Sequence, residues 1–380
     1  MATDTYDVVG ETGNSRLTGN LTVDAIESTV EFDNTPDGAS RGDNLSNDVT
    51  VNVSLQRVGT SVAEPVTVTL VFEGLTRAGE SETVLGTETV QVERGNTTRV
   101  VFDSLSGIPP STIATDDEPV TLRAETGDDT ATREIDISNS VANAAAEAVG
   151  GSEVVTVLGA IDVGGESVEL ASGLEGLTLE GFDASARLFS GDTTLPGPGT
   201  SGLLELRADN VTVRDLDLGL GGSVTGGLPV VDIVADNTTV DNVTATRNAT
   251  GTDDQFTQVV RIGENTTGST VTASTLGGQG AALNAIVTDD AGDATVTGNV
   301  LQGDADIGLT LAGNGSRVEA NNFSAVGGTV DAYIFDFEQA ADLSAIGGTN
   351  SFGPAASLTS VDFHTGGVRV KGSSLVPGPG

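Results

Sequence analysis

The chain contains no cysteine, so disulfide bonds and metal sites built from thiolates are excluded. It also has no tryptophan, one histidine, two tyrosines and a single lysine, Lys371. Such a composition offers neither the basic clusters nor the stacking aromatics that nucleic-acid binding requires, so we exclude that function. No apolar stretch reaches the roughly 18 residues that a membrane-spanning helix needs, so we expect no membrane insertion.

Positive charge is scarce, whereas negative charge is abundant. The 55 acidic and 16 basic side chains give a net charge of −39 at pH 7. In dilute salt this charge would destabilise a compact chain by self-repulsion, but in molar salt the Debye length falls to about 3 Å and screens it. The hydrophobic content of 37% and its regular pattern exclude a disordered acidic chain. We therefore expect a folded protein adapted to a high-salt, halophilic environment.

Two further features favour an extracellular location. The sequence begins Met-Ala-Thr-Asp-Thr-Tyr-Asp, which lacks the charged and apolar regions of a signal peptide. The chain is then either the mature form of a processed protein, or a protein such as a virion component that leaves the cell without classical secretion. Asn-x-Ser/Thr sequons are frequent and indicate a glycoprotein, although Asn-Val-Thr also suits a turn followed by a strand. The candidate glycosylation sites are Asn20, Asn44, Asn52, Asn96, Asn210, Asn237, Asn242, Asn248, Asn265, Asn314 and Asn322.

Residues 19–138 are predicted to form a β-sandwich. Apolar and polar residues alternate in segments such as 49–55 and 66–72, which buries one face of each strand. Gly95 and Gly127 lie in turns between such segments. About seven strands at this spacing predict an immunoglobulin-like fold.

The order of these features resembles the CARDB-like immunoglobulin modules of archaeal and bacterial surface proteins. The matching elements are the strand 66–72, the segment 87–95, the strand 100–102 and the segment 122–129. The resemblance implies a spacer or adhesion module. It implies no chemistry.

A short helix is predicted between this sandwich and the second half of the chain. Ser140 can cap the helix-prone run 141–149, and Gly150 with Gly151 ends it. We expect the helix to lie over the first coil of the following domain.

From residue 153 onward the sequence repeats. Residues 203–216 and 230–243 align position by position, each with an alternating strand, an Asp-Asn turn and a second alternating strand. Equivalent apolar residues are separated by 27, 31, 25, 22 and 25 positions, which is typical of a β-solenoid whose stacked coils bury one column. These residues are Val213, Val240, Val271, Val296, Val318 and Leu343.

This half resembles the right-handed parallel β-helix proteins of the pectate-lyase-like class, which place asparagine at turns between coils. The turn candidates are Asn210, Asn237, Asn265, Asn299 and Asn314. The resemblance implies the fold and leaves activity open, because this class includes lyases, hydrolases, epimerases, adhesins and viral spikes. Two insertions, 183–201 and 248–255, are predicted to be loops that project from the coils.

The predicted organisation is all-β. It comprises an N-terminal extension (1–18), the sandwich (19–138), the helix and linker (139–151), the parallel β-helix (152–371) and a flexible tail (372–380).

No catalytic residue is assigned. His364 is expected to be an exposed residue beside a terminal strand, and the loop 33–38 lacks the downstream ligands of a calcium loop. The only candidate cofactor is Ca²⁺, which carboxylates in two successive turns would hold; solvated acidic turns explain the same residues. These candidate ligands are Asp289, Asp290, Asp293, Asp304 and Asp306.

The sequence therefore predicts a non-enzymatic structural or adhesive surface protein. Within that class we favour a virion surface component of a haloarchaeal virus, such as a spike, turret, decoration or tail protein. Expected partners are other structural proteins or host cell-surface glycans, and a homo-trimer is compatible with an open-ended solenoid.

Two alternatives remain open at this point. One is a haloarchaeal cell-surface or secreted adhesion protein. The other is a polysaccharide lyase or glycoside hydrolase, which would require the acidic turns to converge with Arg261 or Arg317 in a groove.

Overall fold

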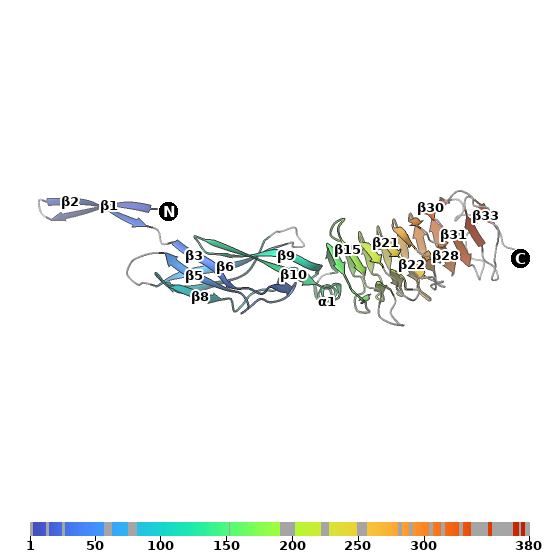
Figure 1. The fold of residues 1–380 in the computed structure, drawn as a ribbon, viewed down its shortest axis with the longest axis horizontal. Helices are drawn as coiled ribbons and strands as arrows, with labels where there is room; N and C mark the ends of the chain where they lie inside the picture. The colour runs from blue at the N-terminus through green and yellow to red at the C-terminus, as the bar shows by residue number, and fades with distance from the viewer. Residues whose placement is uncertain are drawn as a thin grey trace. The chain divides into compact units, whose positions relative to one another are not determined.

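The computed structural model shows a chain built almost entirely of strands, with one helix among the residues that it describes (Figure 1). Contact clustering separates residues 1–110 and 117–138 from residues 111–116 and 139–380, and each unit is described by itself below. The described residues are 3–12, 15–24, 27–56, 63–74, 82–151, 153–190, 202–221, 228–248, 257–279, 283–288, 292–303, 307–312, 316–326, 330–335, 349–351, 368–371 and 374–376.

The first two strands form an antiparallel hairpin. Strand β1 (Thr3–Thr12) pairs with β2 (Ser15–Asp24) along its whole length, from Thr3↔Asp24 to Thr12↔Ser15. Neither strand pairs with any other strand in the described part of the chain. The predicted boundary at residue 18 is therefore corrected. Residues 19–24 complete this hairpin by pairing with residues 3–8 of β1, and the first sandwich strand begins at Glu27.

The sandwich consists of two sheets. One contains β3 (Glu27–Asn34), β5 (Thr50–Gln56) and β8 (Thr97–Val101), all antiparallel. The other has the order β7-β6-β9-β10-β4. Its strands are β4 (Gly38–Ser40), β6 (Ala63–Glu73), β7 (Thr83–Glu93), β9 (Ile113–Glu125) and β10 (Thr130–Asn139).

The strand order confirms the predicted immunoglobulin-like topology. The first sandwich strand is divided between the sheets, because β3 pairs antiparallel with β5 whereas β4 pairs in parallel with the last strand, β10. Inward residues of both sheets form one core, in which Val53, Phe72, Phe102 and Leu122 have no exposed surface. The period-two alternation of the sequence supplies these residues.

Helix α1 (Val141–Gly151) opens the second unit as expected. Ser140 caps it, since its Oγ accepts the Asn143 N–H at 3.1 Å. Val141, Ala144 and Ala148 on one face of the helix are buried in the solenoid core, and the helix contacts the first coil at β11 and β13. The prediction that the helix covers the end of the first coil is confirmed.

Three parallel sheets form the solenoid, and each coil contributes one strand to each sheet. Sheet 1 contains β11 (Val154–Leu158), β14 (Thr178–Gly181), β17 (Thr212–Arg214), β20 (Thr239–Asp241), β23 (Thr270–Thr272), β26 (Thr295–Thr297) and β29 (Arg317–Glu319). Sheet 2 contains β12 (Ala160–Asp162), β15 (Arg187–Ser190), β18 (Asp217–Leu220), β21 (Thr244–Asn248), β24 (Thr275–Gln279), β27 (Val300–Gly303) and β30 (Asn322–Val326). Sheet 3 contains β13 (Val168–Leu170), β16 (Leu204–Leu206), β19 (Val231–Ile233), β22 (Thr257–Ile262), β25 (Leu283–Thr288), β28 (Ile307–Ala312) and β31 (Val330–Phe335).

Two details correct the predicted segmentation. Strand β15 occupies part of the loop expected at 183–201. Strand β32 (Val368–Lys371) pairs antiparallel with β31, and β33 (Ser374–Val376) pairs antiparallel with β32, so residues 374–376 belong to sheet 3. The predicted flexible tail is therefore corrected over that stretch, which forms a strand.

Four successive coils turn two corners around sheet 1 with the same short pattern. A residue with positive φ is followed by an inward residue, a three-residue strand, a second residue with positive φ and a second inward residue. The pairs are Asn210 and Asp215 (φ 61° and 54°), Asn237 and Asn242 (54° and 51°), Gly268 and Ala273 (69° and 49°), and Asp293 and Gly298 (54° and 68°). Asparagine, aspartate and glycine tolerate this left-handed backbone best, which explains why the sequence repeats align.

The centre of each sheet 1 strand fills the core. Val213, Val240, Val271, Val296 and Val318 are register partners in successive strands and are at most 2% exposed. Their burial supplies the column that the sequence spacing predicted.

Buried asparagines replace apolar residues at the corner between sheets 1 and 2 in the later coils. Asn299 Oδ1 accepts the Ser274 N–H at 2.9 Å, and its Nδ2 donates to Val271 O at 2.8 Å and to Asn321 Oδ1 at 3.0 Å. Asn321 repeats the arrangement with Val296 O and Asn350. This ladder satisfies backbone groups at the corner that would otherwise be buried without partners.

Replacing Asn299 with alanine should lower the free energy of unfolding by more than about 2 kcal/mol, because at least two buried polar groups lose their partners at about 1–3 kcal/mol each. Chemical denaturation of the unglycosylated protein measures this. Asn248→Ala, at an exposed strand end, is the matched control and should change stability by less than about 0.5 kcal/mol. Equal effects of the two substitutions would contradict the role of the ladder.

Candidate ligand-binding site on the solenoid

A surface hollow lies at the corner between sheets 1 and 2. The connection from β14 to β15 contains five residues, 182–186, whereas β17 and β18 are joined by Asp215 and Leu216 alone. The longer connection forms an arch beside the next two coils and bounds a hollow of about 490 Å³. Gly181 permits this arrangement, because a Cβ atom there would collide with the Asp215 carbonyl oxygen.

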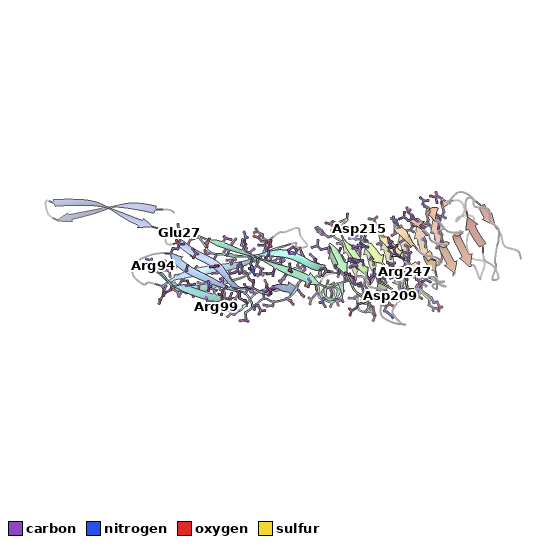
Figure 2. All side chains as sticks on the ribbon, in the orientation of Figure 1. Glu27, Arg94, Arg99, Asp209, Asp215 and Arg247 are labelled. Atoms are coloured by element: carbon purple, nitrogen blue, oxygen red, sulfur yellow. The ribbon has the colours of Figure 1, made fainter. Side chains whose placement is uncertain are left out.

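The hollow combines one exposed aromatic ring with several oxygen acceptors. Phe182 is 50% exposed and is the only aromatic among the large exposed apolar side chains of the described residues. The polar lining residues are Asp183 from the arch, Asp215 and Asp217 from the next coil, and Asn242 and Thr244 from the coil after that. Figure 2 labels Asp215 at this corner and Asp209 at the opposite side of the solenoid in the same view.

Hydrogen bonds order this lining, and they favour the ionised form of Asp183. Asp183 Oδ1 accepts from Ser185 Oγ at 2.5 Å and from the Ser185 N–H at 2.8 Å, and these bonds lower the pKa of Asp183 below its usual value. Asp215 Oδ1 accepts from Asn242 Nδ2 at 2.7 Å. A negatively charged hollow of this kind repels anionic ligands, whereas its ring and its acceptors suit the apolar face and the hydroxyl groups of a neutral sugar.

A second charged feature lies on sheet 3. Glu169, Glu205, Asp232 and Arg261 are register partners on the successive strands β13, β16, β19 and β22. Arg261 binds Asp232 with two hydrogen bonds of 2.8 and 3.0 Å, and Arg207 pairs with Glu205. The side chain of Asp232 is fully buried, and this burial raises its pKa although Arg261 opposes the shift. Because its carboxylate is buried and paired, we interpret the column as a structural ion-pair ladder.

Removing the cation of this ladder should be costly. Arg261→Ala leaves the Asp232 carboxylate buried without its partner and should destabilise the fold by about 3–5 kcal/mol at neutral pH. Arg214→Ala, which breaks the exposed pair with Glu180, is the matched control and should cost at most about 1 kcal/mol.

The destabilisation caused by Arg261→Ala should depend on pH. A carboxyl whose pKa is raised in the folded state binds its proton more tightly there, so its contribution to stability falls as pH rises through the folded-state pKa. The loss caused by Arg261→Ala should therefore be smaller at acidic pH than at pH 7. Denaturation curves at both pH values measure this, and an equal loss at both would contradict it.

The structure describes few of the predicted calcium ligands. Asp293 is exposed at a corner where the backbone is left-handed, a conformation that aspartate tolerates well, so the turn alone accounts for an aspartate at this position. The other four, Asp289, Asp290, Asp304 and Asp306, lie outside the described residues. Within the described ranges, no group of three or more His, Cys, Asp or Glu side chains could hold a metal ion.

The structure describes most of the other residues that the sequence analysis singled out. Arg261 pairs with Asp232, and Arg317 pairs with Glu319 at 2.6 Å. In the loop 33–38, the Asp33 carboxylate accepts from Arg99 at 2.8 Å. His364 lies outside the described residues.

The predicted glycosylation sites separate into two groups. In one group the amide nitrogen already donates a hydrogen bond: Asn44 to Leu105 O, Asn52 to Asp33, Asn96 to Glu93 and Asn242 to Asp215. Asn210, Asn237 and Asn265 form the other group. They are exposed, have positive φ and show no such bond among the described residues.

Four sequons fall outside this division. Asn248 is exposed at the end of β21, and its sequon threonine lies outside the described residues. The Oδ1 atom of Asn322 accepts from Ser324. Asn20 lies on β2, and Asn314 is outside the described residues. Of the predicted turn asparagines, Asn210, Asn237 and Asn265 adopt left-handed turn geometry and Asn299 belongs to the buried ladder.

Several residues of interest were not predicted from the sequence. Glu205 and Asp232 occupy equivalent positions in the two aligned repeats, so their pairing in one column had a detectable signal. The hollow around Phe182 had none, because it depends on how an extra length of turn folds beside its neighbours.

Comparisons with known proteins assign no family to this chain. No family model matches the chain, and no curated protein matches it. Among solved structures, two variants of the catalytic domain of a GH87 alpha-1,3-glucanase in complex with nigerose are similar, at 10% and 12% sequence identity. Each match covers 80% of this chain and 72% of the glucanase chain, with a TM-score of 0.24. Within the described residues, no helix is long and apolar enough to cross a membrane.

Proposed function

We propose that the chain is a structural and adhesive surface protein of a halophilic system, in which the solenoid presents a glycan-binding hollow. The observation that carries this proposal is the exposed Phe182 ring beside the acceptors of Asp183, Asp215 and Asp217. An exposed ring has a cost in water, and its position at the rim of a polar hollow is typical of a binding surface.

Charge and architecture support the same role. A net charge of −39 suits a solvent in which molar salt screens repulsion. The solenoid positions its corners on hydrogen-bonded coils, and such rigid scaffolds hold binding residues in a fixed arrangement. We also propose that the sandwich is related to CARDB-like modules and that the solenoid coils are right-handed.

Within this role we favour a virion surface component of a haloarchaeal virus, such as a spike, turret, decoration or tail protein. The alternative is a haloarchaeal cell-surface or secreted adhesion protein. Other structural proteins and host glycans are the proposed partners, and a homo-trimer is the proposed assembly.

A polysaccharide lyase or glycoside hydrolase is the second candidate function. Glu205 and Asp232 favour it, since paired carboxylates on neighbouring strands are the groups that glycoside hydrolysis uses. Their burial and their pairing with Arg207 and Arg261 favour a structural role instead.

The adhesive role predicts that Phe182→Ala weakens glycan binding about tenfold or more, which corresponds to about 1.4 kcal/mol. Binding of the purified chain to immobilised neutral hexose oligosaccharides and to uronic-acid oligosaccharides, in molar NaCl, measures this. Neutral glycans should bind, and acidic ones should not, because the hollow is anionic. Val84→Ala removes an equally exposed apolar side chain from the sandwich and should have no effect. If the unchanged chain binds neither class, the adhesive role is wrong.

The virion role predicts that peptides of this chain are abundant in purified haloarchaeal virions. Mass spectrometry of virions and of host envelopes from the same culture compares the two locations. Recovery from envelopes alone would contradict the virion role and leave the cell-surface alternative.

A further inference from the structure

The two corners of sheet 1 differ in how they use their polar side chains. At the corner between sheets 3 and 1, the residue before each left-handed asparagine holds the next coil. Asp209 Oδ1 accepts the Asp236 N–H at 2.9 Å, and Asp236 Oδ1 accepts the Thr267 N–H at 2.7 Å. Because the aspartates make these bonds, the amides of the neighbouring Asn210 and Asn237 are not needed to close the corner.

The left-handed conformation also directs these asparagines outward. Asn210 and Asn237 are exposed, and Asn265 occupies a third exposed left-handed position in the turn that leads to β23. A Cβ atom at Gly268 would collide with Asn237 Oδ1, so the carbonyl side of this amide faces the next coil. Each asparagine is followed two positions later by a threonine, namely Thr212, Thr239 and Thr267, and none of these threonines is buried.

At the corner between sheets 1 and 2, the asparagine amide is itself the coil-to-coil contact. Asn242 Nδ2 donates to Asp215 Oδ1 at 2.7 Å, inside the hollow that contains Phe182. In the sandwich, Asn44 is committed in the same way, because its Nδ2 donates to Leu105 O at 2.8 Å while its Oδ1 accepts the Ser46 N–H at 2.8 Å.

We infer that N-glycans are carried by Asn210, Asn237 and Asn265 along one edge of the solenoid, while the sequons whose amides are hydrogen-bonded stay unmodified, namely those of Asn44, Asn52, Asn96 and Asn242. Attachment breaks one N–H bond of Nδ2 and forms a bond from Nδ2 to the anomeric carbon of a sugar, while the phosphate of the sugar's lipid carrier leaves and the proton is released. The glycosyltransferase has to turn the amide into its own active site, so an amide that is held by a hydrogen bond must first release that contact. The modified edge faces away from the Phe182 corner. Because Asn242 lines the hollow, the absence of a glycan on it leaves the hollow accessible to a ligand. This inference rests on the extracellular location in the proposed function.

The arrangement makes the state of Asn242 depend on Asp215. Asp215→Ala removes the acceptor and releases the Asn242 amide without changing the sequon. Asp217→Ala alters another carboxylate of the same hollow but leaves the bond between Asp215 and Asn242 in place, so it is the matched control.

The test is glycopeptide mapping by mass spectrometry of the full chain expressed in a haloarchaeal host that performs N-glycosylation. The expected result is glycan on Asn210, Asn237 and Asn265 and none on Asn44, Asn52, Asn96 or Asn242. Glycan should appear on Asn242 in Asp215→Ala and not in Asp217→Ala.

Glycan on Asn242 of the unchanged chain would overturn the inference, since it would show that the folded contacts do not control modification. An unmodified edge, or an Asn242 that stays unmodified in Asp215→Ala, would overturn it as well. The proposed function is tested by a separate measurement, the binding of oligosaccharides by the unchanged chain. A lack of binding there would contradict the proposed function and would not change the glycopeptide map.

Discussion

The solenoid depends on a backbone constraint that recurs at both corners of sheet 1. To turn from one sheet to the next within two residues, the chain must place one residue in the left-handed region and the next inward. Asn210, Asn237, Asp293 and Gly268 meet the first requirement, whereas Val211, Thr238, Ala294 and Ser269 meet the second. Since the coils that begin at β17, β20, β23 and β26 have the same corner spacing, their strands fall into register and the central valines stack.

Polar groups at the corners have to be satisfied, and the chain does this in two ways. Early coils fill the corner between sheets 1 and 2 with Leu216 and Val243, and later coils fill it with Asn299 and Asn321. The asparagines bond to backbone groups of neighbouring coils, so the later corners are held by directed bonds rather than by apolar contact alone. At the other corner, Asp209 and Asp236 bond to the coil that follows. The fixed edges of the solenoid therefore depend on side chains that a hydrophobic pattern does not reveal.

Charge has separate local and global roles in this molecule. Globally the chain is so acidic that we propose a salt-rich environment for it. Locally several of the arginines are placed beside carboxylates, as in the pair of Arg261 with the buried Asp232 and the pair of Arg41 with Glu118. The hollow at Phe182 has no arginine among its lining residues, and the nearest ion pair to it is a long one, between Arg214 Nε and Asp215 Oδ2 at 4.0 Å. This difference separates the ion pairs that stabilise the fold from the surface that we propose binds a neutral glycan.

The sequence by itself determined the all-β class, the sandwich followed by a solenoid, the connecting helix and the stacked valine column. These features depend on local alternation, on turn chemistry and on a repeat in which Val213 and Val240 recur at equivalent positions, and all of these can be read along one chain. Only the tertiary structure decided that residues 19–24 close a hairpin, that β33 returns to sheet 3, and that the amide of the exposed Asn242 donates to Asp215 whereas the amide of the exposed Asn237 makes no such bond among the described residues. The physical reason is that pairing between strands and contact between coils join residues far apart in sequence, so the partner of an asparagine depends on which coil lies beside it.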